Sequence, residues 1–239
     1  RLASVLTTLS SQGKNITVIS FGNYTVPGNT TTYDVSGQGD KSIVAYVPTT
    51  MYGGWWWGTQ NGTELRVTDT NRDMVAFASG NSICFKSGAS DTSTVFDNIK
   101  TINFDAVDTT RVTSAAYAFY NMKSLTTITG LSRWDTSKIT TMNSMFKGCT
   151  GLKSLDFSSF NTKNVTNFSS MMYGCTGLSK ITVADTFATA YLPTPGFSTG
   201  FTYVSSKMGL TIAGNPSSAL SGYNFTSDNR TVTYNTSTV

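Results

Sequence analysis

Few side chains in this sequence could carry out acid–base or nucleophilic catalysis. The 239 residues contain no His and a single Glu, Glu64, so neither a Ser-His-Asp triad nor a Cys-His pair can form. A pair of catalytic carboxylates would have to come from scattered Asp residues. The sequence has no glycine-rich phosphate loop and no calcium loop with a closing Glu. We therefore predict that the chain is not an enzyme and holds no cofactor and no metal ion.

Two of the three cysteines, Cys149 and Cys175, lie 26 residues apart in similar local sequences. If successive copies stack as neighbouring strands, their Cα atoms should be roughly 5 Å apart. That distance permits a disulfide. It also suits a column of buried thiols that behave as small hydrophobic side chains. The stacked thiols are favoured, and the disulfide stays open.

Three consecutive tryptophans, Trp55, Trp56 and Trp57, are the most unusual local feature. On a strand their side chains must point to alternating faces, so they cannot all enter one core. An exposed indole ring is suited to stacking on a carbohydrate or to a protein contact. The alternative is that they cover the apolar end of the neighbouring repeats.

Charge is sparse and evenly spread. Seventeen basic and 13 acidic residues give a net charge of +4, and Lys and Arg occur singly. A nucleic-acid partner would need clustered basic residues. A membrane span would need roughly 18 consecutive apolar residues, which the sequence lacks. Neither nucleic-acid binding nor a membrane span is expected in this chain.

The sequence repeats at a spacing of 26 residues, where 134–159 align with 160–185. A more divergent copy precedes them, with Leu125 and Ile128 at the positions of Leu152 and Leu155. At least three tandem units therefore cover roughly residues 99–187. The matched pairs are Ile139 with Val165, Met142 with Phe168, Met145 with Met171, Cys149 with Cys175, Leu152 with Leu178, Leu155 with Ile181, and Phe157 with Val183.

Each unit combines a helical spacing with a strand spacing. The apolar residues of 139–146 and 165–172 recur at helical intervals, with Thr140 and Thr166 as expected N-caps and with Gly148 and Gly174 at the ends. Leu155 and Phe157 then alternate with polar residues, as in a short strand. Such small elements must share a core with their neighbours. The prediction is an α+β fold: a leucine-rich-repeat solenoid of parallel strands and short helices in 26-residue units.

Polar residues beside the strand core positions should line up across one face of the predicted sheet. They are Asn103, Thr129, Asp156 and Thr182. That face commonly binds ligands in horseshoe-shaped repeats, so these residues are candidate partner-binding residues. The other interpretation is an ordinary solvated sheet face.

Several phrases resemble the BspA-like leucine-rich-repeat surface proteins of bacteria, their phages and some protozoa. They are WDTSKIT from Trp134, FNTKNVT from Phe160, SMFKGCTGL from Ser144 and SLDFSSF from Ser154. Upstream, YDVS from Tyr33 and DKSIVA from Asp40 resemble a strand pair that often precedes such repeats. The divergent copy departs from the pattern, with Asn121-Met122 in place of Gly-Cys. The resemblance implies an extracellular adhesion or interaction module and supplies no catalytic residues.

The residues outside the repeats predict strands joined by turns. In residues 1–97 the expected strands lie in 16–21, 42–47, 55–67, 74–77 and 82–85, with Asn61-Gly62 as a two-residue type I′ hairpin turn. The first ten residues are too short and too polar for a signal peptide. Strands are also expected at 210–212 and 230–234. We predict a β-rich N-terminal cap (1–97), the repeats (98–187) and a β-rich C-terminal cap with a final strand pair (188–239).

Together these features predict a non-enzymatic adhesion or interaction module, located outside the cell, on the cell surface or on a virion. The expected partner is a protein or glycan on a host or neighbouring cell. The alternative is a structural subunit of a filament, surface layer or phage virion that self-associates through its β-rich ends.

Overall fold

The computed structural model describes residues 2–25, 28–29, 31–34, 56–69, 75–76, 83–85, 92–178, 180–184, 209–213 and 231–234, and every structural statement below concerns these residues. They form one α-helix, one 3-10 helix and twelve strands. The elements are α1 (Leu2–Ser11), β1 (Val18–Phe21), β2 (Thr32–Asp34), β3 (Trp56–Asn61), β4 (Glu64–Asp69), β5 (Val75–Ala76), β6 (Thr101–Phe104), β7 (Val107–Asp108), β8 (Thr127–Thr129), η1 (Leu131–Arg133), β9 (Ser154–Phe157), β10 (Lys180–Ala184), β11 (Gly209–Ala213) and β12 (Thr231–Tyr234).

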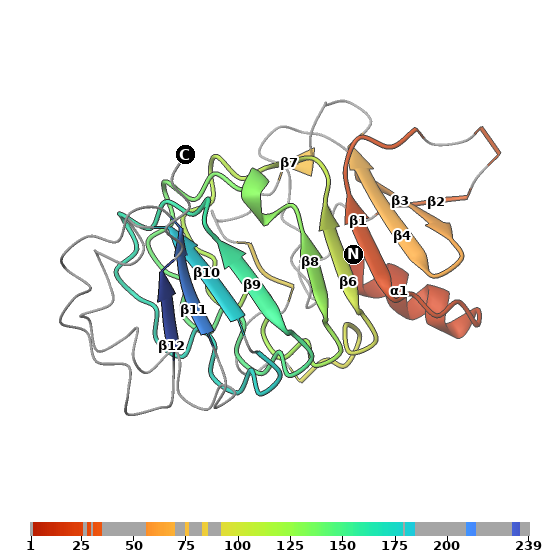
Figure 1. Cartoon of the computed structure of the whole chain (residues 1–239). Helices are drawn as coiled ribbons and strands as arrows, with labels where there is room; N and C mark the ends of the chain where they lie inside the picture. Colours follow the sequence, from red (N-terminus) through yellow and green to blue (C-terminus); the bar gives the residue numbers. More distant parts are fainter. Residues whose placement is uncertain are drawn as a thin grey trace.

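Two sheets run along the molecule (Figure 1). The larger has the strand order β2-β3-β4-β1-β6-β8 and is mixed, because β2, β3 and β4 pair antiparallel while β4, β1, β6 and β8 pair in parallel. The smaller has the order β12-β11-β10-β9 and is parallel throughout. β5 and β7 form a separate two-stranded pair.

The predicted α+β leucine-rich-repeat solenoid is wrong. The described chain is mostly sheet with one α-helix, and its larger sheet mixes parallel and antiparallel pairs. The expected helices in 139–148 and 165–174 are turns. Ser144 and Ser170 have φ values of 53° and 55°, which a right-handed helix does not permit. In the first of these segments the backbone N–H groups of Ser144 and Phe146 bond to the following copy, at the carbonyls of Ser169 and Met171, in place of a helical partner four residues back.

The 26-residue spacing reappears in hydrogen bonds between copies. The N–H of Thr140 donates to the Thr113 carbonyl and that of Thr166 to the Thr140 carbonyl, both at 2.8 Å. The hydroxyls of Thr140 and Thr166 donate to the same two carbonyls, at 3.2 Å and 3.3 Å. These threonines therefore join successive copies, and their predicted role as N-caps is wrong. The predicted ends at Gly148 and Gly174 do turn the chain, with φ of 80° and 75°.

Aromatic rings fill the core between the sheet and the turns. Phe119 and Phe146 stack with ring centroids 5.0 Å apart and planes 11° from parallel. Trp134 contacts Phe104 edge-on at 5.1 Å, and Phe21 stacks on Phe104 at 5.5 Å. Because Phe21 precedes the repeats, one core joins the N-terminal strands to the first copy.

Helix α1 was not predicted from the sequence. It buries Leu2, Val5, Leu6 and Leu9, which recur at helical spacing. We considered this segment only as a signal peptide. The apolar stripe was the signal that could have revealed it.

The outcome of the predicted strands is mixed. β1, β3, β4, β5, β9, β11 and β12 overlap predicted strand segments, whereas residues 83–85 of the predicted strand at 82–85 are not in a strand. The hairpin between β3 and β4 exists, but Asn61 pairs with Glu64, so the loop is Gly62-Thr63 and the predicted Asn61-Gly62 turn is wrong by one residue. Gly62 has φ of 56° at the first loop position, as a type II′ turn requires. The predicted strand at 42–47 and most of the C-terminal cap lie outside the described residues, and the three-region division stays a prediction.

Candidate partner-binding site

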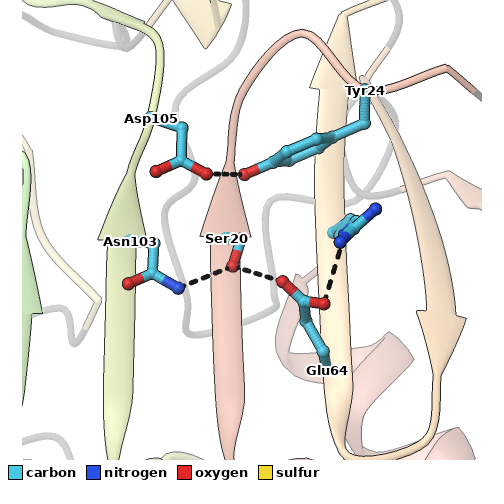
Figure 2. A network of polar contacts seen from close by, with 6 residues as sticks. Ser20, Tyr24, Glu64, Asn103 and Asp105 are labelled. Carbon is cyan, nitrogen blue, oxygen red and sulfur yellow. Dashed lines mark hydrogen bonds and ion pairs between the residues drawn. The ribbon is translucent and has the colours of Figure 1, made fainter.

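A chain of polar side chains crosses β4, β1, β6 and β8 on one face of the larger sheet, and Figure 2 shows its part from Glu64 through Ser20 to Asn103. The Thr129 hydroxyl donates to Asn103 Oδ1 at 2.8 Å, and Asn103 Nδ2 donates to Ser20 Oγ at 3.0 Å. The Ser20 hydroxyl donates to Glu64 Oε1 at 2.7 Å, and Arg66 Nε donates to Glu64 Oε2 at 3.1 Å. We call these five residues the polar row. Two of them, Asn103 and Thr129, were predicted.

The row is positioned by parallel pairing in register. Ser20 on β1 lies opposite Arg66 on β4 and Asn103 on β6, and Asn103 lies opposite Thr129 on β8. The residues on either side along β1 and β6, such as Ile19 and Ile102, are fully buried. The alternation turns the polar residues to the opposite face from the core.

A second polar contact lies beside the polar row on the same face (Figure 2). The Tyr24 hydroxyl donates to Asp105 Oδ2 at 2.5 Å, and the Arg66 guanidinium lies 5.0 Å from the centre of the Tyr24 ring. Burial, together with the hydrogen bond to Asp105 and the charge of Asp105, raises the pKa of Tyr24 well above its ordinary value of 10.0. Tyr24 therefore stays a neutral donor at physiological pH.

The stabilisation from the Tyr24–Asp105 contact should be measurable as a change in the free energy of unfolding at alkaline pH. The folded chain holds the phenol proton more tightly than the unfolded chain, so this stabilisation is complete below the ordinary tyrosine pKa and is lost as pH rises above it. We expect the free energy of unfolding to fall more steeply between roughly pH 10 and pH 12 in the wild type than in Tyr24→Phe. Urea unfolding at several pH values measures both slopes. Equal slopes would contradict the raised pKa.

The predicted residues Asp156 and Thr182 lie opposite each other on β9 and β10, in the smaller sheet. They do not join the polar row, because the two sheets separate between β8 and β9. From Ile128 to Trp134 the chain has one residue more than from Leu155 to Phe160. Gly130, with φ of 77°, and the 3-10 turn Leu131–Arg133 take up the extra residue. The sequence alignment contained this difference, but its effect was not predicted.

A small pocket of about 240 Å³ occupies this break. Hydroxyls of Ser132, Ser154, Ser158 and Ser159 and the carboxylate of Asp156 line it, above apolar atoms of Ile128, Leu131 and Leu155. Asp156 Oδ1 accepts a 2.9 Å hydrogen bond from the Ser158 N–H. The pocket therefore offers one anionic acceptor among neutral hydroxyls.

The three consecutive tryptophans cannot be assigned to this site. Trp55 lies outside the described residues, and only the backbones of Trp56 and Trp57 are described, on β3, where Trp57 pairs with Asp34 and Thr68. Their role in partner binding stays a prediction.

Cys149 and Cys175 are not bridged. Both are fully buried thiols, and their Sγ atoms donate to the carbonyls of Phe119 and Phe146 at 2.9 Å and 3.0 Å. Burial raises the pKa of the Cys175 thiol to about 12, while a backbone hydrogen bond from Cys149 acts in the opposite direction. Of the two alternatives, the structure has the stacked thiols.

Thiol labelling should distinguish these cysteines from the third. At roughly pH 8 we expect the disulfide reagent DTNB to label the half-buried Cys84 in the native chain and to leave Cys149 and Cys175 unmodified, because only an accessible thiolate reacts. In concentrated urea all three should react. Two unreactive thiols under denaturing, non-reducing conditions would instead indicate a disulfide.

Across the described ranges no group of three or more His, Cys, Asp or Glu residues could hold a metal ion. No helix in the same ranges has both the length and the apolar character of a membrane span. Glu64 is engaged by Ser20 and Arg66.

Residues 90–189 match the family described as Mycoplasma protein of unknown function, DUF285. The match includes Asn103, Thr129, Asp156, Thr182 and both buried cysteines, whereas Ser20, Tyr24, Glu64 and Arg66 precede it. Neither the curated proteins nor the solved structures include a significant match to this chain. The polar row thus spans the start of the matched segment and the strands before it.

Proposed function

We propose that the chain is a non-enzymatic interaction module of the BspA-like surface-protein type, which binds a protein or glycan through the face that carries the polar row. One observation carries the proposal. Five side chains from β4, β1, β6 and β8 are joined by hydrogen bonds into one row on the sheet face opposite Ile19 and Ile102; Ser20 in the middle is buried, and Arg66 and Thr129 at the ends are exposed. Side chains held in this way lose little conformational entropy when a partner binds.

The row keeps unused hydrogen-bonding capacity for a partner. Asn103 Nδ2 has a second N–H, and the Thr129 oxygen can still accept. The Arg66 side chain is 46% exposed and donates from Nε to Glu64, which leaves its two outer nitrogens as possible donors to a partner. Neighbouring groups are about one strand spacing, roughly 4.8 Å, apart. Donors and acceptors at this interval suit a polar extended ligand such as a glycan or a peptide strand.

The family match supports the proposal in a limited way, because the DUF285 family is associated with BspA-like proteins. On the same association we propose an extracellular or virion-surface location. The chemistry of the row agrees with binding: Glu64, the sole Glu, accepts hydrogen bonds from Ser20 and Arg66 in a structural contact.

A screen with a matched pair of variants tests the proposal. The full chain is applied to a printed glycan array and to immobilised secreted and surface proteins, and the Kd of each hit is then measured. Asn103→Ala breaks the row and should weaken binding about tenfold, since it leaves Ser20 and Thr129 without their partner. Asn161→Ala, at the far edge of the repeats, should retain the wild-type Kd. Absence of any hit, or equal Kd values for both variants, would contradict the proposal.

Self-assembly is the second candidate. β12 ends the smaller sheet, and within the described ranges no strand pairs with its outer edge. An open edge can accept a strand from another copy. Sedimentation velocity at high concentration separates the candidates: a concentration-dependent series of oligomers favours assembly, and a single monomeric species favours the interaction module.

A further inference from the structure

Three successive turns at one end of the molecule carry a one-sided charge. Residues 120–126, 147–153 and 173–180 contain Lys123, Lys147, Lys153 and Lys180 and no Asp or Glu. Each turn leads into the start of β8, β9 or β10, so all three lie at the end opposite the arrowheads in Figure 1. We call this surface the lysine edge. In the preceding copy, the turn before β6 contains one carboxylate, that of Asp97.

The other end of the same strands is mixed in charge. It carries Asp105, Asp108 and Asp135 beside Arg111, Arg133, Lys138 and Lys163. Hydrogen bonds from the Ser137 hydroxyl and N–H lower the pKa of Asp135, so this carboxylate stays ionised. The contrast means that the lysine edge, which has no carboxylate among its basic residues, carries the larger net positive charge.

The lysine edge is continuous from copy to copy. The Thr150 hydroxyl donates to the Lys123 carbonyl at 3.3 Å, and the Lys180 N–H donates to the Lys153 carbonyl at 3.3 Å. Lys153 Nζ reaches over Gly177 of the next turn, where a Cβ would lie only 3.2 Å from it. Lys123, Lys153 and Lys180 are exposed. The ammonium groups therefore form one surface across three copies.

Tyr173 positions a further ammonium group. Lys147 Nζ lies 5.0 Å from the centre of the Tyr173 ring, which is the distance of a cation–π contact. Among the described residues Tyr173 is the one exposed large hydrophobic side chain, 37% accessible. A nucleobase that stacked on Tyr173 would compete with Lys147 for one face of the ring. The cation–π contact therefore favours a ligand that binds through its charge over one that binds by stacking.

Hydroxyl groups lie among the lysines. Ser124, Thr150 and Thr176 occupy equivalent positions in the three turns, and Thr150 and Thr176 are exposed. A serine or threonine oxygen can accept from a sugar hydroxyl while a nearby lysine binds an anionic group. Alternating charge and hydroxyl chemistry at strand spacing matches a chain of sugars, each bearing hydroxyls and a carboxylate or sulfate.

We propose that the lysine edge binds an acidic polysaccharide, at a surface separate from the polar row. The test uses the full chain and three probes: heparin, polygalacturonate and single-stranded oligo-dT, with neutral dextran as the blank. Lys123→Gln/Lys180→Gln removes two exposed charges from the edge. The matched control, Lys138→Gln/Lys163→Gln, removes two exposed charges from the opposite end of the repeats.

At roughly physiological salt we expect the wild type to bind one or both acidic polysaccharides, and the edge variant to bind about tenfold more weakly, with a smaller dependence on salt. The control pair should change Kd less than about twofold, and Asn103→Ala should bind these polysaccharides as the wild type does. Equal losses in the two lysine pairs, tighter binding of oligo-dT than of either polysaccharide, or no binding of any probe would each overturn the proposal. These outcomes leave the polar-row proposal unaffected, because that proposal is tested with a different variant, Asn103→Ala.

Discussion

Replacing Phe119 with alanine is expected to lower the free energy of unfolding by about 3–5 kcal/mol. Phe119 is fully buried and lies at the centre of the aromatic core, with ring centroids 5.0 Å from Phe146, 5.7 Å from Phe85 and 6.0 Å from Trp134. Truncation would leave a cavity among rings from three different segments, which cannot all close on it. Urea unfolding followed by Trp fluorescence measures the loss.

Tyr120→Ala provides the control for this substitution. Tyr120 is the next residue in the same turn, but its side chain is only partly buried and contacts the Tyr117 ring at 5.4 Å. Its loss should cost about 1 kcal/mol. If Phe119→Ala cost no more than Tyr120→Ala, the core would not be organised around Phe119.

Gly130→Ala is expected to destabilise the chain by about 3 kcal/mol and to disturb the break between the sheets. Two effects combine at this position. Gly130 has φ of 77°, which disfavours any residue with a Cβ. A Cβ there would also lie 2.1 Å from the Phe104 carbonyl oxygen, so the backbone of β6 or of the insertion must move.

Gly62→Ala separates these two effects. Gly62 has φ of 56°, but a Cβ there would meet no atom within 4 Å. Its substitution should therefore cost only the backbone strain, about 1 kcal/mol. The difference between the two variants measures the steric conflict at Phe104. Equal losses would mean that the approach of Gly130 to β6 is not tight.

The strands were more predictable than the turns between them. Leu155 and Phe157 alternate with polar residues, and this period of two identified β9 directly. The segment 139–148 has helical spacing, yet its N–H groups bond to the next copy. Local sequence carries no information about such a partner, so spacing alone predicted helices where the structure has turns.

Two of the five residues of the polar row were visible in the repeat. Asn103 and Thr129 are one repeat apart, so their alignment on neighbouring strands followed from the spacing. Ser20 and Glu64 join them only because β1 inserts between β4 and β6, a pairing of segments about 40 to 80 residues apart in the chain. Topology of this kind leaves no short-range pattern. The break before Asp156 depends on a single inserted residue, whose consequence becomes clear only from the conformation of Gly130.

Carboxyl footprinting tests the central claim, that the face bearing the polar row is where a partner binds. Carbodiimide labelling of Glu64, Asp105, Asp108 and Asp135, read by mass spectrometry, is compared with and without a ligand found in the array screen. Glu64 and Asp105 take part in the contacts of this face, whereas Asp108 and Asp135 accept hydrogen bonds from Thr110 and Ser137 within their own turns. We predict that the ligand protects Glu64 and Asp105 and leaves labelling of Asp108 and Asp135 unchanged. Protection of Asp108 and Asp135 with Glu64 and Asp105 still fully labelled would contradict the claim.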